Sequence, residues 1–223
     1  MMDIECIKTE LKNEEDENFG EILKETDTTV EWYDYDFSYD DHTIVFRDRS
    51  ICTKDLLLSL CHITDKAKAV CGERITPKVM CDILEKAYHD ILPDMMATLR
   101  GVVIIKNAED QEEAFKLVGI SPSAHVDDHI GINIFDSQLC LIMVEPIMES
   151  SEEIVDSMGG RIMDEFMDGV GVTLIHETRH QMIDCNFLLS EDEYPSYLAT
   201  EEQVEQFARQ KWDSIRTYYI GKG

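Results

Sequence analysis

The 223-residue sequence has few basic residues: 20 lysines and arginines stand against 47 aspartates and glutamates, for a formal net charge of -27. A surface this negative repels phosphate groups and anionic lipids, so we expect no direct binding of nucleic acid and no binding to a membrane. No apolar run approaches the roughly 18 residues of a membrane span, and the N-terminus lacks the basic flank and apolar stretch of a secretory signal. These absences predict a cytoplasmic protein.

Paired cysteine motifs are also absent. None of the seven cysteines forms a CxxC pair. Four of them, Cys52, Cys61, Cys71 and Cys81, lie about ten residues apart on ordinary apolar patterns. Thiols stay reduced in the cytoplasm, and a free cysteine behaves as a small buried apolar residue. We therefore predict free core thiols and no cysteine-based zinc cluster.

The length and the 43% of apolar residues fit one globular domain, or one domain with a tail. The composition changes near residue 43, because residues 1–43 contain 15 acidic and 3 basic side chains. We therefore divide the chain into an acidic N-terminal arm over residues 1–43 and a folded domain over residues 44–223.

Two interpretations of the arm follow from its aromatic residues, which occupy every second position from Tyr33 to Tyr39. This alternation is typical of a half-buried strand and predicts an edge strand at residues 30–39, with disorder over most of residues 1–28. Alternatively, the acidic and aromatic segment docks a basic protein partner.

Hydrophobic periodicity predicts the secondary structure of the remaining chain. Helices are expected at about residues 53–63, 77–91, 109–117, 151–167, 172–184 and 200–218, with a glycine break at 169–171. Strands are expected at 101–105, 130–135 and 139–144, and the last two form an antiparallel hairpin. Thr76-Pro77 marks one helix start, and Thr200 with Gln203 forms a capping box at another.

The motif that carries chemistry is His176-Glu177-Thr178-Arg179-His180, an HExxH sequence within an apolar helical stretch. Residues four apart on a helix lie one above the other, so His176 and His180 can bind one zinc ion. Glu177 lies beside that ion, where it can take a proton from an attacking water molecule and pass it to the leaving amine. We predict Glu177 as the catalytic base.

A catalytic zinc ion needs a third protein ligand. The extended motif HExxHxxGxxH does not apply, because Ile183 and Asn186 occupy its glycine and its last histidine. Three acids of the last helix remain, and a helical wheel places Glu201 at the edge of the buried face, Glu205 slightly farther round, and Glu202 toward water. We predict Glu201 as the third ligand and Glu205 as a brace for a histidine ligand; otherwise these acids are exposed and favoured by the helix dipole.

Together, HETRH and the segment Glu201–Ala208 (EEQVEQFA) resemble the gluzincin class of zinc metallopeptidases. The likeness is greatest to the ImmA/IrrE-type peptidases of phages and mobile elements, whose second motif resembles ExEANxFA. Glu201 matches the ligand glutamate of that pattern, whereas Arg179 and Gln203 depart from the usual glycine and acid. The resemblance covers about residues 139–215. It implies an α+β, zincin-like fold, in which a small mixed or antiparallel sheet packs on the HExxH helix and a following ligand-bearing helix.

Other candidate residues have weaker support. His125 and His129 flank two acids in a predicted loop. They either bind a metal ion or are solvated side chains. Asp184 lies on the metal-facing side of its helix, where it either hydrogen-bonds a ligand or ends the helix. Tyr194 and Tyr197 are candidate donors to an oxyanion, or packing residues.

Two functions are consistent with these observations. The first is a zinc-dependent metallopeptidase that hydrolyses an intracellular protein or peptide with water activated by zinc and Glu177. The alternative is a non-catalytic acidic binding module or inhibitor on a zincin-like scaffold, which occupies a basic surface of a partner. The presence of Glu177 favours the enzyme, because a purely structural zinc site needs no base between its histidines.

Overall fold

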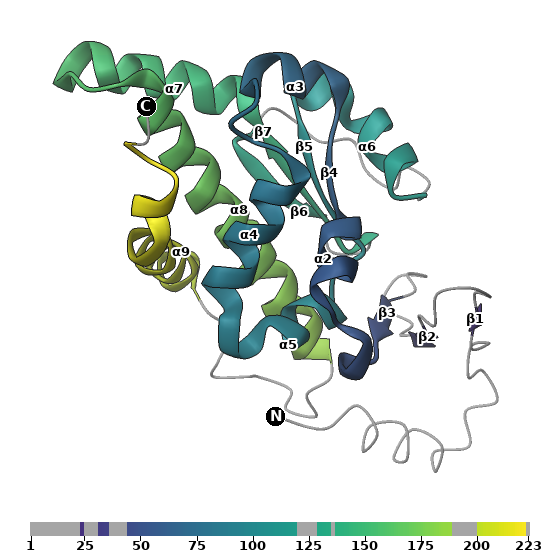
Figure 1. The fold of residues 1–223 in the computed structure, drawn as a ribbon. Helices are drawn as coiled ribbons and strands as arrows, with labels where there is room; N and C mark the ends of the chain where they lie inside the picture. Colours follow the sequence, from purple (N-terminus) through teal and green to yellow (C-terminus); the bar gives the residue numbers. More distant parts are fainter. Residues whose placement is uncertain are drawn as a thin grey trace.

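The computed structural model describes residues 23–24, 31–35, 44–119, 129–134, 137–188 and 200–221 (Figure 1). The helices are α2 (Lys54–Leu60), α3 (Asp65–Cys71), α4 (Pro77–Tyr88), α5 (Leu92–Ala97), α6 (Gln111–Leu117), α7 (Val144–Met158), α8 (Ile162–Leu188) and α9 (Glu201–Ile215). The strands are β1 (Leu23–Lys24), β2 (Glu31–Tyr35), β3 (Ile44–Arg47), β4 (Cys61–Ile63), β5 (Gly101–Ile105), β6 (Gly131–Ile134) and β7 (Leu139–Met143). This is a mixed α+β fold.

The main sheet has four strands in the order β4-β5-β7-β6. Its first three strands are parallel, and β6 pairs antiparallel with β7, as the predicted hairpin requires. All residues of β5 and β7 are buried, so both faces of the sheet are covered. The resulting sheet is mixed, and β6 lies at one edge.

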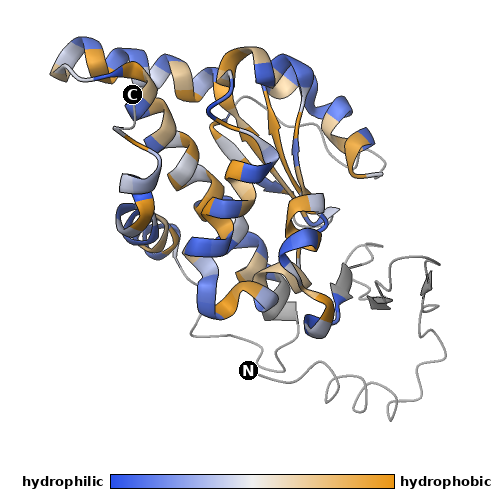
Figure 2. Ribbon diagram, in the orientation of Figure 1, coloured by the Kyte–Doolittle hydropathy of each residue, from blue (hydrophilic) through white to orange (hydrophobic). Residues whose placement is uncertain are grey.

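Alternating side chains of the central strands enter two different hydrophobic clusters. Val102 and Ile104 pack with the large cluster that includes residues of α4, α8 and α9. Val103 and Ile105 pack with a smaller cluster that includes Phe115 of α6. Figure 1 shows α6 on one side of the sheet and α8 on the other, and apolar residues line the strands between them (Figure 2).

A second sheet contains β1, β2 and β3, all antiparallel. The predicted edge strand at residues 30–39 includes β2, which is the middle strand of this sheet. Strand β3 contacts α5. The other residues predicted for that strand, and residues 1–22 of the arm, lie outside the described residues.

The predicted glycine break at residues 169–171 is wrong, because α8 is one continuous helix of 27 residues. Both glycines allow neighbouring helices to approach closely. A Cβ atom at Gly169 would lie 2.6 Å from Ile147 Cγ2 of α7, and one at Gly171 would lie 2.4 Å from the Trp212 ring of α9. The chain instead breaks at Gly159 and Gly160, which both have positive φ angles.

The helix predicted from residue 53 is shorter than its periodicity indicates. Helix α2 ends at Leu60, and Ile63 belongs to β4, which pairs in parallel with β5. Pairing with a buried strand here overrides a local helical pattern. The predicted start at Thr76-Pro77 is confirmed, since the Thr76 side chain caps α4 and Pro77 is its first residue.

Two further sequence expectations can be compared with the described part of the chain. Cys52, Cys61, Cys71, Cys81 and Cys140 are free, and all of these except Cys52 are buried, as expected for core thiols. No helix among the described residues combines the length and apolarity needed to cross a membrane.

Candidate metal centre

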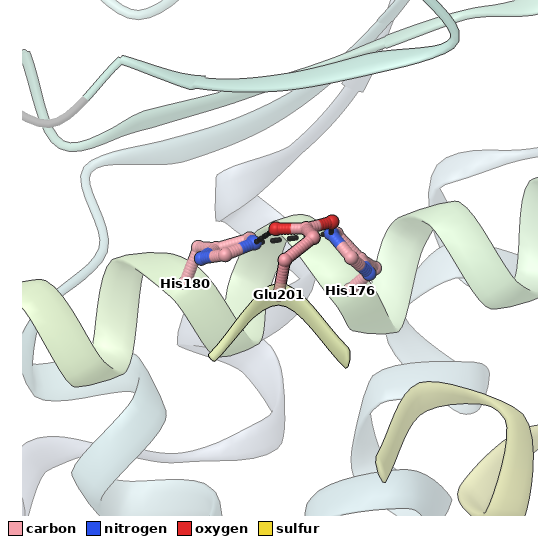
Figure 3. Close-up of side chains that lie close together, drawn as sticks. All are labelled: His176, His180 and Glu201. Carbon is pink, nitrogen blue, oxygen red and sulfur yellow. Dashed lines mark hydrogen bonds and ion pairs between the residues drawn. The ribbon is translucent and has the colours of Figure 1, made fainter. Parts of the chain in front are cut away.

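Helix α8 presents His176 and His180 one turn apart, near the middle of its length. Their ring centroids are 4.7 Å apart, and their Nε2 atoms are 3.0 Å apart (Figure 3). Both side chains are largely buried, with exposed fractions of 12% and 24%. The two imidazoles therefore converge on one point at the surface of the helix.

Glu201, at the first turn of α9, completes the cluster. One carboxylate oxygen lies 2.9 Å from His176 Nε2 and the other 3.0 Å from His180 Nε2. The capping box between Thr200 and Gln203 fixes this turn, because each residue's side chain accepts a hydrogen bond from the other's backbone N–H. The predicted ligands are thus brought together from two helices.

The donor set suits a zinc ion. One ligand atom from each of His176, His180 and Glu201 lies within 4.8 Å of the others. Tetrahedral coordination at about 2.0–2.1 Å places ligand atoms about 3.3 Å apart, a few tenths of an ångström more than the separations here. Burial lowers the pKa of His176, as does the neighbouring His180, and this favours the neutral imidazole that a metal ion requires.

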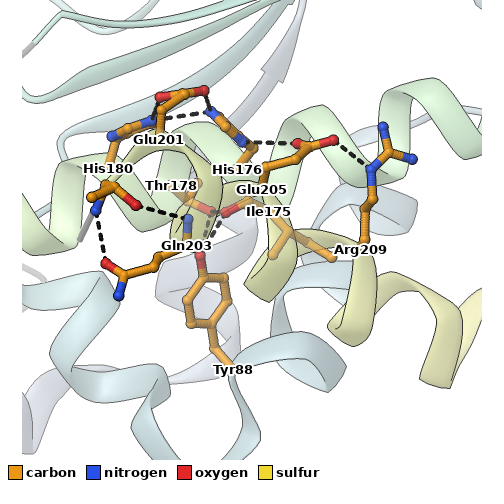
Figure 4. A network of polar contacts seen from close by, with 10 residues as sticks. Tyr88, Ile175, His176, Thr178, His180, Glu201, Gln203, Glu205 and Arg209 are labelled. Carbon is orange, nitrogen blue, oxygen red and sulfur yellow. Dashed lines mark hydrogen bonds and ion pairs between the residues drawn. The ribbon is translucent and has the colours of Figure 1, made fainter.

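Glu205 and Arg209 extend this cluster along α9 (Figure 4). A carboxylate oxygen of Glu205 lies 3.2 Å from His176 Nδ1, on the opposite side of the ring from Glu201. The other oxygen lies 2.5 Å from Arg209 Nε. A carboxylate at Nδ1 orients an imidazole whose Nε2 binds a metal ion, which is the position we expected for Glu205.

Glu177 lies between α8 and the edge strand β6. Its side chain is buried, and it accepts a hydrogen bond from the backbone N–H of Asn133. A Cβ atom at Gly131 would lie 2.8 Å from Glu177 Oε1, so only glycine leaves room for the carboxylate. Burial raises the pKa of Glu177 to about 8, and the charge of Glu201 contributes to the shift.

The HExxH segment is held in place from α4. The buried Tyr88 hydroxyl donates to the Ile175 backbone carbonyl at 2.8 Å and lies 2.9 Å from Thr178 Oγ1. The Arg179 guanidinium lies 4.6 Å from the centre of the Phe207 ring of α9, and that ring lies 5.8 Å from the Tyr88 ring, centre to centre. These contacts couple the two ligand-bearing helices.

Asp184 does not end its helix, because α8 continues to Leu188. Its carboxylate accepts a hydrogen bond from Asn133 Nδ2 at 3.0 Å. Burial raises the pKa of Asp184, while the charge of His180 and the Asn133 hydrogen bond oppose the shift. Asp184 therefore anchors β6 on α8 next to the histidines.

The remaining weak candidates are mostly outside the described residues, which omit His125, Tyr194 and Tyr197. His129 is described and exposed, and it lines a cleft of about 450 Å³ together with His176, Glu177 and Glu201. The metal cluster therefore opens on a cavity large enough for part of a peptide.

Four residues of the site were not predicted from the sequence: Asn133, Gly131, Tyr88 and Arg209. The first three contact the HExxH helix from segments at least 40 residues away, and no local pattern indicates such contacts. Arg209 follows Glu205 at the spacing of a helical ion pair, so this signal was present in the sequence.

No family model, curated protein or solved structure matches the chain. The likeness to ImmA/IrrE-type peptidases consequently rests on HETRH and on residues 201–208.

Proposed function

We propose that the protein is a zinc-dependent metallopeptidase in which His176, His180 and Glu201 hold the ion and Glu177 is the general base. The observation that carries the proposal is the position of this base: Glu177 lines the same cleft as His176 and Glu201. Structural zinc sites are closed by four protein ligands, whereas catalytic sites keep one position open. Among the described residues this cluster has three members.

A bound zinc ion would polarise the scissile carbonyl and acidify the attacking water. Glu177 takes the proton from that water and delivers it to the leaving nitrogen, while Glu205 holds His176 in the tautomer that leaves Nε2 free. Burial raises the pKa of Glu177 to about 8 in the metal-free protein; a bound zinc ion would lower this pKa and leave the carboxylate ionised, as a general base must be.

The edge strand β6 supplies a binding surface for the substrate. Among the described strands it pairs with β7 alone, and its first residue, Gly131, lines the cleft beside Glu177. An extended peptide can add to such an edge through main-chain hydrogen bonds. This arrangement favours a peptide bond over a small-molecule ester or amide as the target.

The test measures zinc and cleavage together. Elemental analysis should give about one zinc per chain for the parent and for Glu177→Gln, and far less for His180→Ala. With a mixed pool of peptides as substrate, Glu177→Gln should lower the cleavage rate by about 100-fold or more, whereas the exposed control Glu202→Gln should not. Cleavage by Glu177→Gln at the parent rate would refute Glu177 as the base, and a zinc-loaded parent without any cleavage would refute the peptidase.

A further inference from the structure

The cleft that holds the metal cluster continues along α8 toward its N-terminus, between α7 and α9. There Ile147, Ser151 and Ile154 of α7 form one wall, and Glu165, Asp168 and Gly169 of α8 form the floor. The cavity therefore has two isoleucine side chains and two serines on its α7 side, beside a negatively charged floor.

The carboxylates in this part of the cleft differ in what they contact. Asp168 accepts hydrogen bonds from Trp212 Nε1 and from Arg216, and Glu205 is paired with Arg209. Glu165 has no hydrogen-bond or ion-pair partner for its side chain among the described residues. Glu165 is thus the carboxylate that remains for a bound cation.

A lysine or arginine side chain matches this cavity. Its methylene stem can pack on apolar surface while its charged group meets a carboxylate. The net charge of -27 also attracts a basic substrate at long range. Arg209, the cation that lines the cleft, is 67% exposed and paired with Glu205, so it does not cancel the charge of Glu165.

The spacing along α8 fixes where the basic residue lies in the substrate. Glu165 precedes His176 by eleven residues, or about 16 Å at a rise of 1.5 Å per residue. An extended peptide rises about 3.3 Å per residue, so about 16 Å corresponds to about five residues when the lysine side chain stands perpendicular to the peptide. When the lysine side chain, about 6 Å long, lies along the cleft, the remaining distance of about 10 Å corresponds to about three residues.

We propose, on the basis of the proposed peptidase activity, that Glu165 determines specificity: the substrate is a peptide segment with a lysine or arginine about three to five residues from the bond that is cleaved, and its cationic group binds Glu165 at the α7 side of the cleft.

The experiment uses quenched ten-residue peptides on a neutral background, in which one lysine is moved through every position. Matched series carry norleucine or glutamate in its place. Lysine about three to five residues from the cleaved bond should raise kcat/KM by about 10-fold or more over norleucine, and glutamate should lower it. Glu165→Gln should remove the lysine preference, so that the ratio of kcat/KM for lysine peptides to that for norleucine peptides falls to about one. The matched control Glu152→Gln alters an exposed acid of α7 outside the cleft and should keep the preference.

A second measurement separates this inference from the proposed activity. Fluorescence anisotropy with zinc-loaded Glu177→Gln protein reports peptide binding without cleavage. Lysine peptides should bind about 10-fold more tightly than norleucine peptides, and the additional change Glu165→Gln should abolish the difference. Equal binding of the lysine and norleucine series, or equal effects of Glu165→Gln and Glu152→Gln, would overturn the assignment of Glu165. Failure of the parent to cleave any peptide would instead overturn the peptidase, and the binding data would still decide the role of Glu165.

Discussion

Glu177→Gln should stabilise the metal-free protein, and the gain should depend on pH. The carboxyl group is buried, and its pKa rises from 4.5 to about 8 on folding. Folding therefore favours the protonated acid. The loss of folding stability caused by burying this carboxyl group is absent below pH 4.5, grows as the pH rises toward 8, and is then constant. Glutamine keeps the shape of the protonated side chain and carries no charge at any pH.

The magnitude follows from the interval between the two pKa values. Each pH unit within it costs about 1.4 kcal/mol of unfolding free energy. At pH 7, which is 2.5 units above 4.5, the penalty is on the order of 3 kcal/mol, and at pH 5 it is about 1 kcal/mol. Glu177→Gln should recover most of this energy.

Urea denaturation in the presence of a chelator, at pH 5, 6, 7 and 8, measures the effect against the exposed control Glu202→Gln. Bound zinc should reduce the difference in unfolding free energy between the parent and Glu177→Gln, because the cation compensates the charge of the buried carboxylate. A stability difference between parent and Glu177→Gln that is the same at pH 5 and pH 8 would show that Glu177 is not held as a buried acid.

Further predictions concern zinc binding and packing. Glu201→Ala should weaken zinc binding by about 10-fold or more in a competition titration with a chelator, while Glu202→Ala should not; equal effects would mean that Glu201 is no ligand. Glu205→Gln should weaken zinc binding by about 10-fold through loss of the contact with a histidine Nδ1, and unchanged affinity would remove that role. Gly171→Ala places a methyl group against the Trp212 ring and should lower the free energy of unfolding by about 2 kcal/mol in urea, whereas a neutral result would refute the close approach.

The features that could be predicted from the sequence depend on residues that lie at most four positions apart in the chain. Thr76-Pro77 and the Thr200–Gln203 capping box start helices where expected, and His176 and His180 share one helix face. The helical wheel also separates Glu201 from its neighbours, because a helix rotates by a fixed angle per residue. Local geometry therefore identifies all three candidate ligands, although it does not bring the two helices together.

The parts that could not be predicted depend on pairing between distant segments. The hairpin of β6 and β7 was expected, but only the parallel pairing of β7 with β5 puts β6 at the edge, where Asn133 meets Glu177. Similarly, nothing local shows that Ile63 leaves a helical pattern to pair with β5. Strand order is a property of the whole chain.

Gly171, which was wrongly predicted to interrupt the helix, helps to position the third candidate ligand, Glu201. Glycine weakens a helix in isolation, so Gly171 indicates an interruption when only local propensity is considered. In the fold, its missing side chain lets Trp212 of α9 lie against α8, and Trp212 Nε1 is fixed further by Asp168. Glu201 precedes Trp212 by eleven residues and His180 follows Gly171 by nine, so at 1.5 Å per residue both lie about 14 to 17 Å from this contact. Helices α8 and α9 run antiparallel, so the segment from Gly171 to His180 and the segment from Trp212 back to Glu201 extend from this contact in the same direction. The contact at Gly171 therefore sets the register that brings Glu201 to the histidines.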